Sequence, residues 1–215
     1  MPNSTNPIDN DAVSRAYDFV LGWFGGPWTD GDYPQTLKDT LGDILPEFTE
    51  EEKELIKGSC DFYAIDAYSG YYVGALEDTA DCVSNSSAPG YPECVDQSSI
   101  QPNGFGVGPA GDPGVNWLKS TPLGIRGFLN DITKKLFPSV HEIMVTEFGF
   151  AEPFESKWDN VQDATWDLRR MDYLQTYLDS ILLAINEDGI NVSGAFIWSI
   201  CKLWSGTSDG MRVKC

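Results

Sequence analysis

The order in which strand-forming and helix-forming segments follow one another constrains the fold of this 215-residue chain more than any other feature. Segments typical of strands lie at 61–73, 143–147 and 192–200, and the helical patterns 117–138 and 168–185 separate them. Strands that alternate with helices form a parallel sheet, either a barrel or a doubly wound sheet. No glycine-rich phosphate-binding loop follows these strands, which disfavours a dinucleotide-binding fold. The sequence therefore predicts an α/β fold that is part of a (β/α)8 barrel, because a closed barrel needs eight strands.

Two helices are predicted in the N-terminal part of the chain. Apolar and small side chains recur at helical spacing in 11–24, and the Gly-Gly-Pro sequence at 25–27 predicts that this helix stops there. Thr49 is followed three residues later by Glu52, a pair typical of a capping box at the start of a helix. Residues 74–116 are rich in Gly, Pro and Ser without periodicity, and we predict a long loop there.

The clearest helical pattern, 168–185, is followed by Gly189, where a C-terminal cap belongs. Its apolar residues recur at three- and four-residue steps, which predicts a face buried in the core. The residues of this predicted face are Leu168, Met171, Leu174, Leu178, Ile181 and Ile185. The apolar segment 192–200 is predicted to be a final buried strand. We find no internal repeat and no linker, so 1–215 is predicted to be a single incomplete barrel domain.

Composition excludes several classes of partner. The formal net charge is −19 and the isoelectric point is about 4.1, which opposes binding to nucleic acid, whose phosphates need basic partners. The same sign of charge disfavours anionic membrane surfaces, and no apolar run is long enough to span a bilayer. We therefore predict no nucleic acid and no membrane partner. Neutral substrates such as sugars are not repelled by this charge.

Two kinds of feature favour an extracellular or secretory location. The sequence contains glycosylation sequons at Asn3, Asn85 and Asn191, and Cys82 and Cys94 bracket a Ser/Pro/Gly-rich loop that a disulfide could close. In contrast, the first residues lack the basic and apolar regions of a signal peptide. An N-terminus other than the natural one reconciles these observations.

The remaining cysteines and the single histidine do not form a metal-binding pattern. Cys60 and Cys201 lie in apolar surroundings and are predicted to be buried thiols, whereas Cys215 has no assignable role. His141 is the one histidine, and no Cys/His cluster accompanies it. We therefore predict no metal ion and no cofactor.

The strand at 143–147 ends in a carboxylate, Glu147, which Phe148 and Gly149 follow. A (β/α) barrel presents its catalytic groups at the carboxyl ends of its strands, so Glu147 is a candidate catalytic acid. The alternative is an ordinary strand-end glutamate that faces water, and this segment alone does not decide between them.

Several segments together resemble glycoside hydrolase family 1, the β-glucosidase family. They are LGWFGGP with GDYP, LPEFTEEEKELIKGSCDFYAIDAYS, WLKSTPLGIR, VTEFG and AFIWSI. They follow one another in the family's order and extend over 11–214, nearly the whole chain. The resemblance implies the C-terminal half of the family's barrel, with its sixth to eighth strands, their helices and long rim loops. It also implies a retaining hydrolase that acts on β-glucosides.

The resemblance implies a role for five residues. Glu147 matches the catalytic nucleophile of the family's Thr-Glu-Asn-Gly motif, and Tyr68 matches the tyrosine whose hydroxyl holds that carboxylate. Trp198 resembles the tryptophan on which a sugar ring stacks. Asp66 stands at the first position of the family's Asn-Tyr-Tyr, and Trp204 matches a sugar-binding tryptophan if a deletion is assumed; both are predicted to bind substrate. The alternatives are an ordinary strand aromatic for Tyr68 and a core position for Trp198.

The sequence also departs from the family pattern. Phe148 stands where the family has Asn, and no Glu follows the last strand, where the family uses one to bind sugar hydroxyls. The Asn-Glu-Pro motif that supplies the family's general acid does not occur in the sequence. We therefore expect a hydrolase or a fragment of one that carries the nucleophile without the acid. The alternatives are a non-catalytic sugar-binding pseudoenzyme and a truncated product.

A sheet of three parallel strands has two open edges, and such edges invite pairing with other chains. We therefore expect the chain to pair with the missing N-terminal half or with a second copy, or to aggregate.

Overall fold

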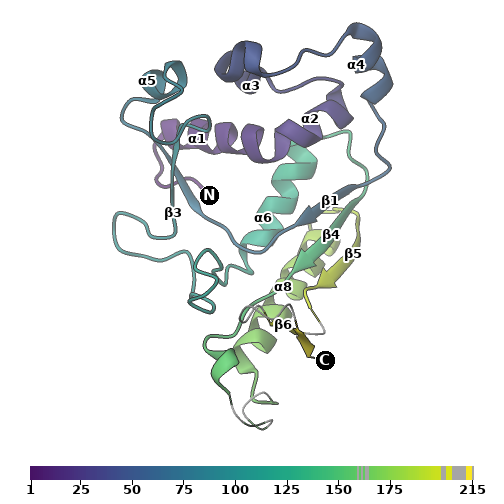
Figure 1. The fold of residues 1–215 in the computed structure, drawn as a ribbon. Coiled ribbons are helices and arrows are strands. Elements are labelled where there is room, and N and C mark those ends of the chain that lie inside the picture. Colours follow the sequence, from purple (N-terminus) through teal and green to yellow (C-terminus); the bar gives the residue numbers. More distant parts are fainter. Residues whose placement is uncertain (159, 161, 163–164, 200–201, 205–211, 215) are drawn as a thin grey trace. The chain divides into compact units, whose positions relative to one another are not determined.

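The computed structural model describes the chain except for residues 159, 161, 163–164, 200–201, 205–211 and 215 (Figure 1). The chain divides into two compact units. Unit 1 comprises Met1–Tyr63, Gly70–Val107 and Asp131–His141, and unit 2 comprises Ala64–Ser69, Gly108–Asn130 and Glu142–Cys215. The prediction of a single incomplete domain stays a prediction.

The main sheet consists of β1 (Tyr63–Asp66), β4 (Ile143–Phe148) and β5 (Val192–Ile197), in the order β1-β4-β5. β4 and β5 are parallel, with Ile143 opposite Val192. Between them in the chain lies α8 (Leu168–Asn186), and between β1 and β4 lies α6 (Gly124–Asp131), which begins seven residues later than the predicted 117. Thr121 and Pro122 form the turn that delays it, since the Gly124 N–H donates to the Thr121 carbonyl. This alternation confirms the predicted α/β class.

The buried face of α8 overlaps the predicted one but is shifted toward two tyrosines. Among the predicted residues, Leu168 and Met171 are 56% and 62% exposed, and the others are buried or half-buried: Leu174, Leu178, Ile181 and Ile185. Tyr173 and Tyr177, which the predicted face did not include, are buried. The reason is ring packing, because Phe148 at the end of β4 stacks on Tyr177 with ring centroids 4.2 Å apart. A tyrosine ring covers more apolar surface than a leucine, and its hydroxyl can still reach a carbonyl oxygen. The helix therefore turns its tyrosines toward the sheet.

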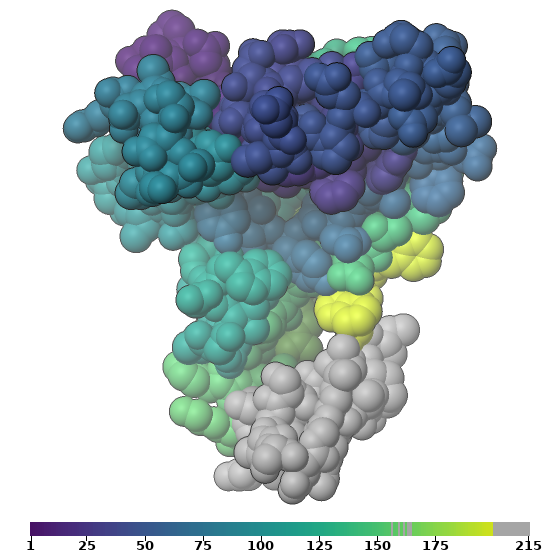
Figure 2. All heavy atoms as spheres, turned by 45° about the horizontal axis from the view of Figure 1, so that its top comes forward, coloured from purple at the N-terminus to yellow at the C-terminus, as the bar shows by residue number. Residues whose placement is uncertain are grey.

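The predicted strand at 192–200 is confirmed for Val192–Ile197, but the prediction that it is buried is wrong. Phe196, Ile197 and Trp198 are 56%, 43% and 49% exposed, and Figure 2 shows the yellow residues of this segment on the surface. β5 is the last strand in the sheet order, so no further strand of the described residues covers its outer edge. Apolar side chains that a family barrel would enclose are thus open to solvent here.

The first helix of unit 1 does not stop at 25–27 as predicted. The helical segments that follow one another without a break are α1 (Pro7–Tyr17), the π-helix η1 (Asp18–Gly22) and α2 (Trp23–Asp30). Pro27 lies inside α2, and the helix ends only at Gly31, where φ is 89°. Gly25 is needed for packing, because a Cβ at this position would stand 2.5 Å from the Phe137 ring. Gly25 therefore allows the Phe137 ring to pack closely against the helix, and it does not mark a helix end.

Unit 1 also contains shorter elements. These are α3 (Gln35–Leu41), η2 (Gly42–Ile44), α4 (Glu50–Ile56), β2 (Tyr72–Ala75), α5 (Thr79–Ser84), β3 (Val95–Ser98) and η3 (Ile132–Leu136). The capping box of Thr49 and Glu52 is confirmed at the start of α4. The predicted strand 61–73 is divided into β1 and β2, and the predicted loop 74–116 contains α5 and the antiparallel pair β2–β3. That pairing joins segments far apart in sequence, which periodicity cannot reveal.

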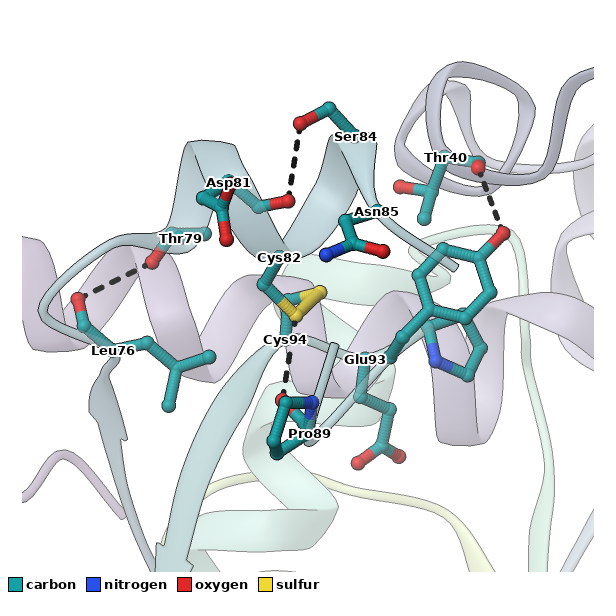
Figure 3. Close-up of a disulfide and its surroundings, with 12 residues drawn as sticks. Thr40, Leu76, Thr79, Asp81, Cys82, Ser84, Asn85, Pro89, Glu93 and Cys94 are labelled. Atoms are coloured by element: carbon teal, nitrogen blue, oxygen red, sulfur yellow. Dashed lines mark hydrogen bonds between the residues drawn. A yellow bond between two sulfur atoms is a disulfide. The ribbon is translucent and has the colours of Figure 1, made fainter. Parts of the chain in front are cut away.

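The disulfide between Cys82 and Cys94 is confirmed and closes the loop that carries α5 (Figure 3). Cys60 is half-buried in the loop before β1, so the prediction of a buried strand position is wrong for it. Cys201 and Cys215 lie outside the described residues. In the described part of the chain, no helix is long and apolar enough to cross a membrane.

Three short elements complete the chain: η4 (Glu155–Lys157) follows β4, and the antiparallel strands β6 (Lys202–Trp204) and β7 (Arg212–Lys214) follow β5.

Candidate active site

Glu147 lies at the carboxyl end of β4, where an irregular register changes the direction of its side chain. Val145 is opposite Ala195 and Phe148 is opposite Ile197, so three steps along β4 match two steps along β5. Such an extra residue is a β-bulge, which re-aims side chains and is common beside active sites. Val145 and Phe148 remain fully buried, whereas Glu147 is half-buried and accessible.

Tyr68 is the hydrogen-bond partner of Glu147. Its hydroxyl donates to Glu147 Oε2 at 2.8 Å, and the Ala67 N–H donates to the Glu147 carbonyl oxygen at 2.9 Å. Burial, and then the hydrogen bond to Glu147 and its charge, raise the pKa of Tyr68, so the phenol keeps the proton that it donates. One contact therefore holds the carboxylate of Glu147, and the other holds its backbone, at the end of β4.

The tyrosines of α8 position this segment in turn. The Tyr173 hydroxyl donates to the Tyr68 carbonyl oxygen at 3.2 Å, and the Tyr177 hydroxyl donates to the Ala67 carbonyl oxygen at 2.6 Å. Burial also raises the pKa of both tyrosines, so each remains a hydrogen-bond donor. The backbone that carries Tyr68 is thus fixed by buried groups of the helix that packs behind it.

Asp66 lies at the end of β1, next to β4. The Thr146 hydroxyl donates to Asp66 Oδ1 at 2.7 Å, and it also lies 3.0 Å from the Ile65 carbonyl oxygen. Asp66 is exposed, and its charge contributes to the raised pKa of Tyr68. The structure therefore brings Asp66 to the same strand ends as Glu147, with Thr146 between the two strands.

Trp198 reaches the end of β4 through its backbone. Its N–H donates to the Phe148 carbonyl oxygen at 2.8 Å, and the peptide bond from Trp198 to Ser199 is cis. A Cβ on Gly149 would stand 2.1 Å from the Trp198 carbonyl oxygen, so this close approach requires glycine. About half of Trp198 is exposed, which leaves it available for stacking. The side chain of Trp204 lies outside the described residues.

Trp117 is a residue of the site that sequence reasoning missed. Its ring stands edge-on to the Tyr68 ring, with centroids 5.7 Å apart, and it is half-exposed. Ser69 fixes the neighbouring backbone, because its hydroxyl donates to the Lys119 carbonyl oxygen at 3.0 Å and accepts from the Lys119 N–H at 2.8 Å. The available signal was a tryptophan just ahead of the proline turn at 121–122, but the predicted helix 117–138 included this position.

Two further carboxylates on the loop after β4 are bound to arginines of α8. Glu152, which is 5% exposed, pairs with Arg169 at 2.7 Å, and Glu155 pairs with Arg170 at 2.8 Å. These pairs attach the loop to the helix. Among the described residues, no group of three or more His, Cys, Asp or Glu side chains could hold a metal ion.

Comparison with known proteins identifies relatives of nearly the whole chain. The family model described as glycosyl hydrolase family 1 matches residues 1–214. Ipecac alkaloid beta-glucosidase 9 of Carapichea ipecacuanha is 34% identical over 94% of this chain, which covers 36% of that protein. Beta-glucosidase 1B of Phanerodontia chrysosporium is 34% identical over 93% of this chain and 34% of its own length. The chain thus spans about a third of the length of these curated relatives.

Solved structures give the same result for the fold. Beta-glucosidase 2 of the fungus Trichoderma reesei superposes with a TM-score of 0.83 at 31% identity, over 100% of this chain and 44% of that chain. A mutant of a rice beta-glucosidase, in a covalent complex with Glc, superposes with a TM-score of 0.82 at 31% identity. It matches 95% of this chain and 41% of its own length.

Proposed function

Since this chain belongs to glycosyl hydrolase family 1, we propose that the end of β4 carries the nucleophile of a retaining β-glucosidase-type site. The observation that carries the proposal is the 2.8 Å hydrogen bond from the Tyr68 hydroxyl to the Glu147 carboxylate. Covalent catalysis requires a carboxylate that is charged, accessible and held in one orientation. Glu147 is accessible, and the hydrogen bond from Tyr68 orients it; the family supports a glycoside hydrolase.

In the proposed reaction, Glu147 attacks the anomeric carbon of a β-glucoside while the bond from that carbon to the leaving oxygen breaks. The product is a glycosyl ester on Glu147, which water then hydrolyses. Tyr68 keeps one carboxylate oxygen bound, so the other can point toward the sugar. Trp198 and Trp117 supply exposed aromatic faces on which a sugar ring or its substituent can stack. The covalent Glc complex of the rice relative supports this assignment.

A retaining site also needs a general acid, and none of the residues proposed above supplies one. Retaining hydrolases place a second carboxyl group about 5–5.5 Å from the nucleophile. The sequence contains no Asn-Glu-Pro motif, and Glu152 and Glu155 are paired with Arg169 and Arg170. We propose that the acid comes from a part of the family's barrel that does not lie within these residues.

A non-catalytic sugar-binding module is the second candidate. Phe148 takes the place of the family's Asn after the nucleophile, and it is buried against α8, where it cannot reach a sugar hydroxyl. Half-exposed aromatic rings such as Trp198 could retain sugar binding without turnover.

An activated 2-deoxy-2-fluoro-β-glucoside separates the two functions. The fluorine slows breakdown of the ester, and a good leaving group removes the need for acid, so a competent nucleophile is trapped. The proposal predicts an intact-mass gain of one fluoroglucosyl group per chain. Glucose binding by calorimetry without any mass gain would instead support the binding module.

Substitution of Tyr68→Phe tests the hydrogen bond that positions the nucleophile. Hydrogen bonds to charged groups contribute about 1.5–3 kcal/mol, so the labelling rate is expected to fall about 10- to 100-fold. Tyr72→Phe, in β2, makes the same chemical change at a tyrosine to which the proposal gives no role, and it should label at the wild-type rate. Equal rates for Tyr68→Phe and wild type would show that the hydrogen bond does not contribute.

We also propose that the exposed apolar surface of unit 2 pairs with another polypeptide, either the remaining part of the family's barrel or a second copy. Phe196 and Ile197 of β5 and Leu182 of α8 are exposed, and large exposed apolar side chains of this kind are candidates for an interface. By light scattering, the chain alone is expected to self-associate, and Phe196→Lys should weaken that association. A monomer that unfolds cooperatively would contradict the proposal.

A further inference from the structure

The loop closed by Cys82 and Cys94 contains a glycosylation sequon, Asn85-Ser86-Ser87. We propose that Asn85 carries an N-linked glycan and that this loop is the modification site of the chain. The proposal is independent of the catalytic role of Glu147.

The geometry of Asn85 suits attachment of a glycan. Asn85, Ser86 and Ser87 are all exposed directly after α5. Asn85 Oδ1 accepts the Ser87 N–H at 3.1 Å, and within the described residues Nδ2 has no hydrogen-bond partner. Asn85 Nδ2, the atom that would bear the sugar, is therefore available for attachment. Asn85 Oδ1 accepts the hydrogen bond that stabilises the turn formed by the sequon.

The other two sequons are less suitable. Asn3 is held against β2, because its N–H donates to the Val73 carbonyl oxygen at 2.8 Å and its Oδ1 is buried. Asn3 is also half-buried, whereas Asn85 is exposed. Asn191 is exposed, but its carbonyl oxygen accepts the Ile143 N–H at 3.0 Å and its sequon continues into β5 through a half-buried Val192.

The disulfide is an independent observation that points to the same compartment. Figure 3 shows Asn85 beside Cys82, within the loop that the Cys82–Cys94 bond closes. Disulfides persist in oxidising compartments, and asparagine glycosylation is a modification of proteins in the secretory pathway. The sequon and the disulfide in this loop therefore both support passage of the chain through the secretory pathway.

The chemistry of attachment is a group transfer that the host's transferase performs. Asn85 Nδ2 forms a bond to the anomeric carbon of an oligosaccharide that a lipid diphosphate carries. The bond from that carbon to the diphosphate oxygen breaks, the lipid diphosphate leaves, and Nδ2 loses one proton. No oxidant or reductant is required.

The test uses the full 215-residue chain, directed by an added leader into the secretory pathway of a eukaryotic host. The expected result is one glycan, removed by peptide N-glycosidase and mapped to position 85 by mass spectrometry. Asn85→Gln and Ser87→Ala should each abolish it, and Ser87→Thr and Ser86→Ala should keep it. Because Ser87→Ala leaves the Asn85 side chain intact, loss of the glycan in that variant is not a folding defect.

Two outcomes would overturn the proposal. One is a secreted, folded chain without any glycan at position 85. The other is a glycan that persists in Asn85→Gln and disappears in Asn191→Gln.

Discussion

Glu147→Gln is expected to abolish covalent labelling by an activated 2-fluoroglucoside, with a loss in rate of at least about 10⁴-fold. An amide oxygen carries no charge and is a far weaker nucleophile than a carboxylate. The amide can still accept the hydrogen bond that Tyr68 donates at 2.8 Å, so the local structure should be preserved. The loss should therefore reflect chemistry, and the far-ultraviolet circular dichroism of the variant should match the wild type.

Glu142→Gln is the matched control for this substitution. Glu142 directly precedes β4 at the opposite end of the strand and undergoes the same chemical change. It should label at the wild-type rate. If Glu147→Gln also labels at that rate, Glu147 is not the nucleophile and the site proposed here is wrong.

A steep dependence on the leaving group is the second large effect that we expect. General acid catalysis contributes about 10²–10⁴-fold in rate, and substrates with basic leaving groups depend on it most. The ratio to compare is the rate with dinitrophenyl β-glucoside divided by the rate with an alkyl β-glucoside. In a chain without the acid this ratio should be about 10²–10⁴-fold larger than in a complete family enzyme. Steady-state rates for a series of aryl and alkyl glucosides measure this ratio.

Addition of azide provides an independent check on the missing acid/base group. Azide needs no base to attack a glycosyl ester, so it should accelerate turnover of the dinitrophenyl substrate and yield the β-glucosyl azide. A shallow dependence on the leaving group, with no response to azide, would show that an acid/base group is present in the chain. Glu152 and Glu155 would then be the residues to substitute.

Local patterns predicted the strand that carries the site. The apolar run at 143–147 leads into an acid and a glycine, and the structure has β4 ending at Phe148 with Glu147 at its carboxyl end. The partnership of Tyr68 with Glu147 came from the family resemblance, since spacing alone does not place residues 79 positions apart in contact.

The predictions that failed depended on packing partners. Gly25 and Pro27 read as a helix end, but Gly25 admits the Phe137 ring and Pro27 is accommodated within α2. The apolar stripe of α8 missed the buried tyrosines, because Tyr177 stacks on Phe148 in an aromatic contact between distant segments. Trp117 was missed for the same reason, since its relation to the site depends on the Tyr68 ring.

The exposure of β5 has a different cause. The segment 192–200 is predicted to be buried because most of its side chains are apolar. In this structure the sheet order ends at β5, so Phe196 and Ile197 remain exposed. The apolar sequence of a strand shows that it suits a buried position. Whether the strand is buried depends on a neighbouring strand or helix that covers it.

The most direct test of the proposed nucleophile is to locate the covalent sugar. The chain would be labelled with the 2-fluoroglucoside, digested with a protease and sequenced by tandem mass spectrometry. We predict a fluoroglucosyl ester on Glu147 and on no other carboxylate. An adduct on Glu152 or Glu155, or labelling spread over several surface acids, would contradict it.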